Sequence, residues 1–166
     1  EDKTREVDGG FVLAGWNRTL SETSGFQMQM LYDRTRQRNV QPNETRDTFE
    51  IDFQHRFLAG VRNDVIWGAN YRWSKDDTES TFTISLDPSS RTLRLLSGFI
   101  QDEISLSGDS LFLTVGTKVE QNNFSNNELE WEPNIRLSWN VTETQVLWAS
   151  IARAARVPSR VEQSAT

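Results

Sequence analysis

Residues 129–141 alternate between apolar and polar positions without a break. The apolar positions are Leu129, Trp131, Pro133, Ile135, Leu137, Trp139 and Val141, and the polar positions are Glu130, Glu132, Asn134, Arg136, Ser138 and Asn140. A β-strand turns successive side chains to opposite faces, so this pattern predicts a strand with one apolar and one polar face. At roughly 3.3 Å per residue the strand would reach about 40 Å, against about 17–20 Å for an ordinary globular strand. A strand this long and this strictly two-faced is typical of a wall between a bilayer and water.

The same alternation recurs along the chain and predicts about eight strands. It is regular in residues 26–33, 49–57, 64–73 and 111–120, and less clean in residues 10–20 and 95–106. Val146 and Trp148 begin a last strand in the same pattern, which becomes small and basic toward Arg156.

The connections between these strands alternate in length. Short polar turns lie at residues 21–24, 59–63, 107–109 and 142–144, and longer polar stretches lie at residues 37–46, 76–91 and 121–127. This order predicts an all-β, antiparallel up-and-down meander, with tight periplasmic turns and extended outer loops. A β-sandwich with Greek-key crossovers gives no reason for so regular an alternation. Residues 81–85, within the stretch 76–91, also alternate, so we expect the hairpin that contains them to extend beyond the membrane.

Composition narrows the classes of function. The chain has 166 residues, enough for one domain, and no apolar run of the roughly 18 residues that a transmembrane helix needs. Its mean hydropathy of −0.62 is compatible with transmembrane strands, because their faces alternate. The net charge of −6 argues against a nucleic-acid partner, and the absence of cysteine excludes disulfides and thiolate metal sites.

The six tryptophans call for an explanation at this chain length. Trp67 and Trp73 lie six residues apart on one face, and Trp131 and Trp139 lie eight apart. With a strand tilt near 40°, these gaps project to roughly 15 and 20 Å along a membrane normal, against about 25 Å for the apolar band of a barrel. We therefore expect aromatic girdles at the two rims of the band. The alternative is a soluble core filled by these rings.

Candidate chemistry is sparse, and we predict no catalytic, cofactor-binding or metal-binding residue. His55 is the only histidine and lies on an apolar face, where an interfacial aromatic role is expected. Glu130 and Glu132 share one face as a glycosidase pair would, but such pairs are common on any polar strand face. The acidic residues Asp76, Asp77 and Glu79 lack the spacing of a calcium loop and are expected to form a solvated loop.

The polar faces carry both signs of charge. We expect the cations Arg18, Arg56, Arg72, Lys118, Arg136 and Arg153 to interleave with the acids Glu50, Asp52, Asp64, Glu103, Glu120, Glu130 and Glu132. A lumen lined in this way can hold cross-strand pairs, a polar plug or a hydrated solute.

Four stretches resemble the middle of the barrel of the TonB-dependent outer-membrane receptors. They are residues 97–103 (SGFIQDE), 113–120 (LTVGTKVE), 131–139 (WEPNIRLSW) and 149–159 (ASIARAARVPS). The order and spacing of the four also match the family. Glu132 and Asn134 stand where the family has Ser and Arg around the proline, and Ala155 stands where an aromatic residue is common.

This resemblance implies that residues 1–166 are part of a larger barrel domain. The family has a barrel of 22 strands and an N-terminal plug with a TonB box, and neither plug nor box is found in this chain. The last residues, Gln163 to Thr166, also differ from the aromatic-ended final strand of outer-membrane proteins. The implied location is the outer membrane of a Gram-negative bacterium, in contact with lipid. The implied partner is the TonB complex, reached through the plug.

The resemblance implies a transport function and no enzyme activity. The family takes up scarce nutrients, most often iron–siderophore complexes, and its ligand contacts lie on the plug and the outer loops. No motif marks a ligand-binding residue in this chain, so the outer-loop stretches 37–46 and 76–91 are the expected place for one. Two alternatives stay open: a complete eight-stranded outer-membrane barrel, adhesin, porin-like or a small enzyme, and a soluble lipocalin-like ligand binder.

Overall fold

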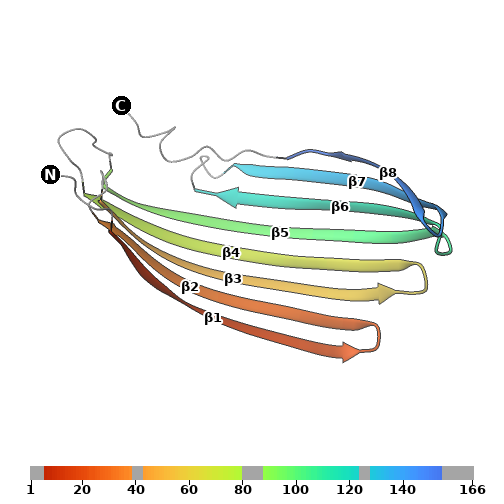
Figure 1. The fold of residues 1–166 in the computed structure, drawn as a ribbon, viewed down its shortest axis with the longest axis horizontal. Helices are drawn as coiled ribbons and strands as arrows, with labels where there is room; N and C mark the ends of the chain where they lie inside the picture. The colour runs from red at the N-terminus through yellow and green to blue at the C-terminus, as the bar shows by residue number, and fades with distance from the viewer. Residues whose placement is uncertain (1–5, 39–42, 80–87, 124–127, 155–166) are drawn as a thin grey trace.

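The computed structural model describes residues 6–38, 43–79, 88–123 and 128–154. These residues form one antiparallel sheet whose eight strands pair strictly in chain order (Figure 1). The strands are β1 (Glu6–Ser21), β2 (Ser24–Arg38), β3 (Asn43–Ala59), β4 (Asn63–Glu79), β5 (Ser90–Ser107), β6 (Leu111–Asn122), β7 (Leu129–Thr142) and β8 (Gln145–Ala152). The predicted all-β, up-and-down meander of about eight strands is therefore confirmed.

The strands are longer than the alternation predicted. The predicted loop boundaries are wrong at the strand ends that the long connections join, which we call the upper ends. β2 and β3 pair as far as Gln37 and Glu44, inside the predicted loop 37–46. β4 and β5 pair as far as Asp77 and Ser90, inside the predicted loop 76–91. Here both faces of the strands are polar, so hydrophobic periodicity vanishes although the backbone ladder continues. The alternating residues 81–85 lie outside the described residues.

The register places the two kinds of side chain on opposite faces of the sheet. One row across its middle reads Met30, Ile51, Tyr71 and Leu96 on β2 to β5. The adjacent row reads Gln29, Asp52, Asn70 and Ser97. We call the face that carries the first row the apolar wall and the face that carries the second the polar wall.

No hydrophobic side chain in the described residues is buried. On the apolar wall, Ile100, Trp131 and Ile135 are each about half exposed, at 53%, 54% and 50%. A soluble ligand binder would enclose such residues in a core or cavity, because their burial is the main source of its stability. The described residues therefore leave the apolar wall uncovered.

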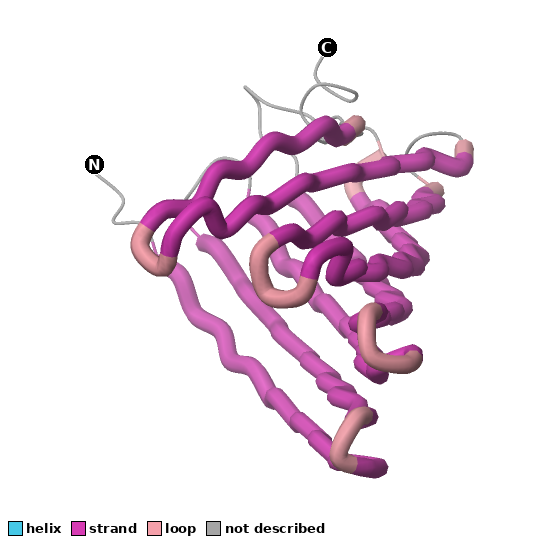
Figure 2. The backbone as a smooth tube through the Cα atoms, turned by 90° about the vertical axis from the view of Figure 1, so that its right-hand side faces the viewer, coloured by secondary structure: helices cyan, strands magenta, loops and turns pink. Residues whose placement is uncertain are grey.

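The sheet is curved and open. Figure 2 shows the eight strands following one another around an arc, with β1 and β8 at its two edges. Within the described residues, β1 pairs with β2 alone and β8 with β7 alone, so the chain does not close into an eight-stranded barrel. No helix among the described residues has the length and apolar character to cross a membrane.

The short turns match their predicted positions. The turn between β3 and β4 contains Gly60 at φ 77°, and the turn between β5 and β6 contains Gly108 at φ 49°. Both angles lie in the left-handed region that glycine adopts without steric cost. Register shifts next to three of the four short turns lie between Thr19 and Ser21, Ser105 and Ser107, and Asn140 and Thr142.

Candidate functional site: a wall with two faces

Two rows of aromatic residues cross the apolar wall near its two ends. The row nearer the short turns contains Phe26, His55 and Trp67, which oppose one another on β2, β3 and β4. The row nearer the long connections contains Tyr32, Phe49 and Trp73 on the same strands. The predicted spacing of Trp67 and Trp73 on one face is confirmed, and the apolar band between their rows is about 15 Å high at a tilt near 40°.

His55 takes part in the lower row as an aromatic with two hydrogen bonds. Its ring stacks on Phe57 at 5.4 Å and meets Trp67 edge-on at 5.9 Å between centroids. The Trp67 Nε1–H donates to His55 Nδ1 over 3.1 Å, and His55 Nε2 lies 2.8 Å from Ser24 Oγ. Because the indole can only donate, Nδ1 is the acceptor and Nε2–H donates to Ser24. The expected interfacial role of His55 fits this geometry.

The lower row is part of a chain of ring contacts that joins four strands. Trp16 meets Phe26 edge-on at 4.9 Å, Phe26 lies 5.9 Å from Phe53, and Phe53 lies 5.4 Å from Trp67. Aromatic pairs at these separations stabilise by about 0.5–1.5 kcal/mol beyond the area they cover. The cluster ties β1 to β4 across the apolar wall.

Sequence reasoning missed a polar pair on the apolar wall. Asp102, the aspartate of the segment SGFIQDE, opposes Val65 and Val115, so it faces the apolar side. Asn63 Nδ2 donates to its Oδ2 over 2.6 Å and thereby ties the start of β4 to β5. Strict alternation along β5 would have predicted this placement. Phe99, Gln101 and Glu103 fall on the polar wall, so Asp102 between the last two falls on the apolar wall.

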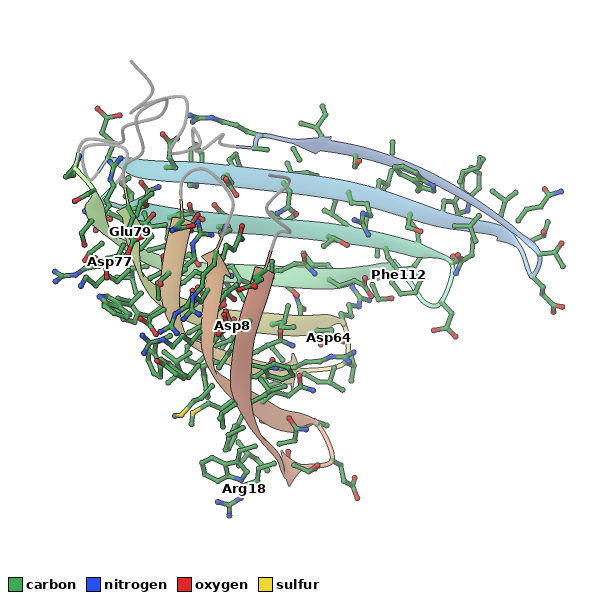
Figure 3. The ribbon with its side chains drawn as sticks, turned by 60° about the vertical axis from the view of Figure 1, so that its left-hand side comes forward. Asp8, Arg18, Asp64, Asp77, Glu79 and Phe112 are labelled. Carbon is green, nitrogen blue, oxygen red and sulfur yellow. The ribbon has the colours of Figure 1, made fainter. Side chains whose placement is uncertain are left out.

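The polar wall neutralises much of its charge within the sheet, as predicted. Arg56 donates from Nε to Asp64 over 2.8 Å, and Arg72 grips Glu50 with two nitrogens at 2.9 and 3.0 Å. Further pairs are Arg46 with Glu44 at 2.6 Å, Lys118 with Glu120 at 2.7 Å and Arg153 with Glu130 at 3.6 Å. Asn70 adds hydrogen bonds to Glu50 and Asp52, at 2.8 and 3.4 Å. Figure 3 shows the side chains on both sides of the sheet.

Two placements predicted for the walls are wrong. Arg18 opposes Phe26 and therefore lies on the apolar wall (Figure 3), not among the lumen cations. Trp148 opposes Ser138 and lies on the polar wall, while Leu147 takes the position opposite Trp139. A register shift between Asn140 and Thr142 next to the β7–β8 turn makes this change of face.

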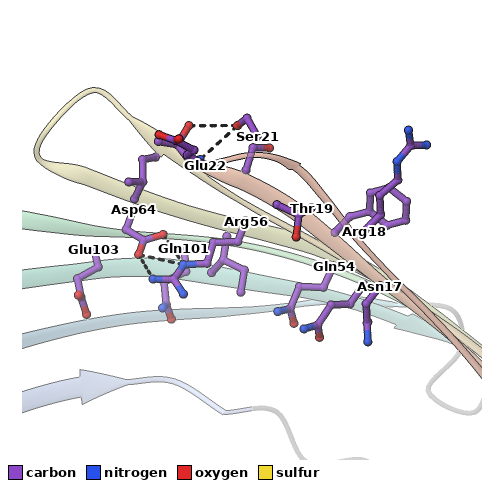
Figure 4. Close-up of a pocket in the computed structure, with 17 residues that line it drawn as sticks. Asn17, Arg18, Thr19, Ser21, Glu22, Gln54, Arg56, Asp64, Gln101 and Glu103 are labelled. Atoms are coloured by element: carbon purple, nitrogen blue, oxygen red, sulfur yellow. Dashed lines mark hydrogen bonds and ion pairs between the residues drawn. The ribbon is translucent and has the colours of Figure 1, made fainter.

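A hollow of about 750 Å³ lies at the short-turn end, largely against the polar wall. Figure 4 shows Asn17, Gln54 and Gln101 lining it, beside the Arg56–Asp64 ion pair and Glu103. Amide side chains both donate and accept hydrogen bonds, so this surface suits water, a hydrated solute or polypeptide backbone.

One aromatic ring lies on the polar wall over a glycine. Phe99 opposes Gly68, and a Cβ at position 68 would come within 2.6 Å of the Phe99 ring and would collide with the Phe53 carbonyl oxygen. Glycine is therefore required at position 68 for the two strands and the ring to approach this closely. The ring is one of several apolar side chains on the polar wall, where Leu31 opposes Glu50 and Trp148 opposes Ser138.

The other candidate residues do not assemble into a site. Asp76 accepts from the Arg91 backbone N–H at 3.1 Å, Asp77 pairs with Lys75 at 3.2 Å, and Glu79 accepts from Asn43 at 3.0 Å. These three acids lie on a strand, not in a loop as expected, and Asp76 and Asp77 point to opposite faces. Among the described residues, no group of three metal-ligating side chains is found. Glu130 is engaged by Arg153, and Glu132 opposes Lys118.

The fold and its two walls define a class of protein: a curved antiparallel sheet with an apolar outer face and a charged inner face, as in transmembrane β-barrels. The family model for the TonB-dependent receptor-like β-barrel matches residues 3–166, so the chain belongs to this family. The crystal structure of the siderophore receptor PirA from Pseudomonas aeruginosa is similar, with a TM-score of 0.71 and 16% sequence identity. The alignment covers 92% of this chain and 28% of that chain, so this chain spans about a quarter of the receptor it matches. A search of curated proteins gave no match.

Proposed function

We propose that residues 1–166 are one section of the barrel wall of an outer-membrane receptor that takes up a scarce nutrient, most often an iron–siderophore complex. The observation that carries the proposal is the pair of opposite walls on strands of up to 18 residues. The apolar wall would contact lipid between its two aromatic rows, and the polar wall would line the lumen. The family membership and the likeness to a siderophore receptor support this interpretation.

The complete barrel would have 22 strands, of which this chain supplies eight. The unpaired edges of β1 and β8 fit this proposal, because an exposed strand edge carries a row of free backbone donors and acceptors. Neighbouring strands of the same receptor would pair with both edges. A plug domain would fill the lumen and pass force from the TonB complex to the bound ligand. In this proposal the section itself performs no chemistry.

Uptake of radioactive iron by living cells tests the function. The full receptor gene is deleted and restored in iron-starved cells, and uptake of ⁵⁵Fe is measured with hydroxamate and catecholate siderophores as the probes. We expect one probe class to lose most of its uptake on deletion and to regain it with the restored gene. Unchanged uptake of every probe would argue against an iron–siderophore receptor.

Ligand contacts are proposed at the connections from β2 to β3 and from β4 to β5, together with the polar strand ends that flank them. Lys75 opposes Thr92, so removing residues 76–91 and inserting a two-residue turn would close the hairpin without changing the register below it. We expect this variant, made in the full receptor, to fold and to lose uptake. Heat-dependent gel mobility checks the folding of the barrel. Full uptake in the shortened receptor would place the ligand contacts elsewhere.

A further inference from the structure

Arg94 on β5 is a cation at the margin of the apolar wall. It opposes Trp73 of the upper aromatic row, so its side chain leaves the sheet on the apolar side. Its residue is exposed, and no carboxylate in the described part of the chain pairs with its guanidinium. An isolated charge at such a place is costly unless it reaches water or an anion.

Asn123 binds the backbone around Arg94 with both its side chain and its main chain. Asn123 Oδ1 accepts from the Arg94 N–H at 2.8 Å, and the Asn123 N–H donates to the Arg94 carbonyl at 3.2 Å. Asn123 Nδ2 also donates to the Thr92 carbonyl over 2.9 Å. The strand is thus fixed at the point where the Arg94 side chain leaves it.

A second cation lies diagonally across from the first. Lys75 opposes Thr92, two residues from Arg94, and diagonal neighbours of this kind are about 7–8 Å apart. Lys75 contacts Asp77 at 3.2 Å, but the two side chains are 44% and 51% exposed, so this ion pair is weak and exchangeable. The nearby Asp47 is already engaged by Tyr32 at 2.7 Å and by Arg34 at 3.7 Å.

An apolar surface begins directly below the two cations. Trp73 lies level with Arg94 and two residues from Lys75 toward the middle of the wall, and Leu96, two residues along from Arg94, is 54% exposed. A free inorganic anion would gain nothing from this surface. An amphipathic ligand would place its charge on the cations and its methylenes on Trp73 and Leu96.

We propose that Arg94 and Lys75, with the apolar side chains of Trp73 and Leu96 beside them, form a binding site for the phosphate headgroup of a membrane lipid. The site rests on the proposed membrane location, because only a lipid brings phosphate and acyl chain together at this margin. It is distinct from uptake, since it lies on the wall that faces away from the lumen. Guanidinium and ammonium groups hold phosphate by charge-assisted hydrogen bonds.

Binding of lipid to the purified full receptor tests the site. The probes are phosphorylated lipid A, the same lipid after dephosphorylation, and inorganic phosphate, with bound lipid counted by native mass spectrometry. The variants are Arg94→Gln and the double variant Arg94→Gln/Lys75→Gln. The matched control is Arg136→Gln, an exposed arginine on the polar wall that opposes Thr114.

We expect the phosphorylated lipid to bind the wild type and the Arg136→Gln control alike. Loss of the charge-assisted bonds should weaken binding about tenfold in Arg94→Gln, and further in the double variant. Equal binding by wild type and double variant would overturn the proposal, as would equal binding of the dephosphorylated lipid. Displacement of the lipid by millimolar inorganic phosphate would show a free-anion site and overturn it too. The assay contains no transport substrate, so a failure of the proposed uptake leaves its result unaffected.

Discussion

The two walls of the sheet are built by the same strands but are stabilised in different ways. The polar wall supplies its own partners, as the grip of Arg72 on Glu50 and the pair of Lys118 with Glu120 show. The apolar wall has ring contacts between neighbours but leaves residues such as Ile100 half exposed. This contrast indicates that one face is adapted to water and the other to a nonpolar medium. The backbone pairing between strands is the same whichever medium each face contacts.

The largest expected effect comes from placing a charge on the wrong wall. Met30 and Gln29 are adjacent on β2, and Gln29 opposes Asp52 on the polar wall. We expect Met30→Arg to destabilise the full receptor in lipid by about 2–4 kcal/mol, as an arginine near the bilayer midplane does in other barrels. Gln29→Arg gains an acidic neighbour and should change stability little. Urea unfolding in lipid vesicles measures both, and equal losses would mean that the walls do not face different media.

Gly68 tests how closely the strands must approach on the polar wall. A Cβ there would meet the Phe53 carbonyl and the Phe99 ring, so we expect Gly68→Ala to cost about 1–3 kcal/mol. Gly98, across the ladder from Ala69, is the matched control, because a Cβ at Gly98 would lie at an ordinary 3.6 Å from the Gly68 carbonyl oxygen. The same unfolding assay compares the two variants. A Gly98→Ala loss as large as that of Gly68→Ala would contradict the steric argument.

His55 tests whether hydrogen bonds on the apolar wall count toward stability. His55→Leu removes the acceptor of the Trp67 indole and the donor to Ser24, and we expect a loss of about 1 kcal/mol. Ser24→Ala removes one of the two bonds and should cost less. The emission of Trp67 reports the change directly, in a background with the other tryptophans replaced by phenylalanine. An unchanged spectrum in His55→Leu would show that the indole N–H has no partner in His55.

The smallest effect is expected at an ion pair of the polar wall. The Arg72 and Glu50 side chains are 47% and 21% exposed, and pairs of this kind contribute about 0.2–1 kcal/mol. We expect Arg72→Gln to cost no more than this, since Asn70 still donates to Glu50. A double-mutant cycle with Glu50→Gln isolates the pair. A coupling energy well above 1 kcal/mol would show that the lumen is drier than an exposed surface.

Sequence periodicity predicted the fold because each strand crossing carries its own two-faced signal. The short turns were equally readable, since polar residues with Gly60 or Gly108 interrupt the alternation. The upper strand ends were not, because Arg46 and Asp76 pair across strands that are polar on both faces. The charge of Arg18 favours the polar wall, but Arg18 lies two residues from Trp16 and therefore shares its face.

The sequence predicted a polar wall with charges of both signs, but it did not predict which residues pair with one another. Ion pairs such as Arg56 with Asp64 depend on cross-strand register, which separates residues by eight positions here. The pairing of Asn63 with Asp102 spans 39 positions and requires the full meander. The position of Arg94 at the margin of the apolar wall follows only from its pairing with Trp73 on the next strand, which no local sequence pattern shows.

The register shifts beside the short turns have a consequence for how such a chain can change length. A single residue gained or lost within a regular strand would move every later side chain of that strand to the opposite face of the sheet. A bulge absorbs that odd residue, and the described shifts lie where the strand has just left or is about to enter a short turn. Insertions of odd length are therefore tolerable at the short-turn margin, whereas changes in the span between the two aromatic rows must come in pairs.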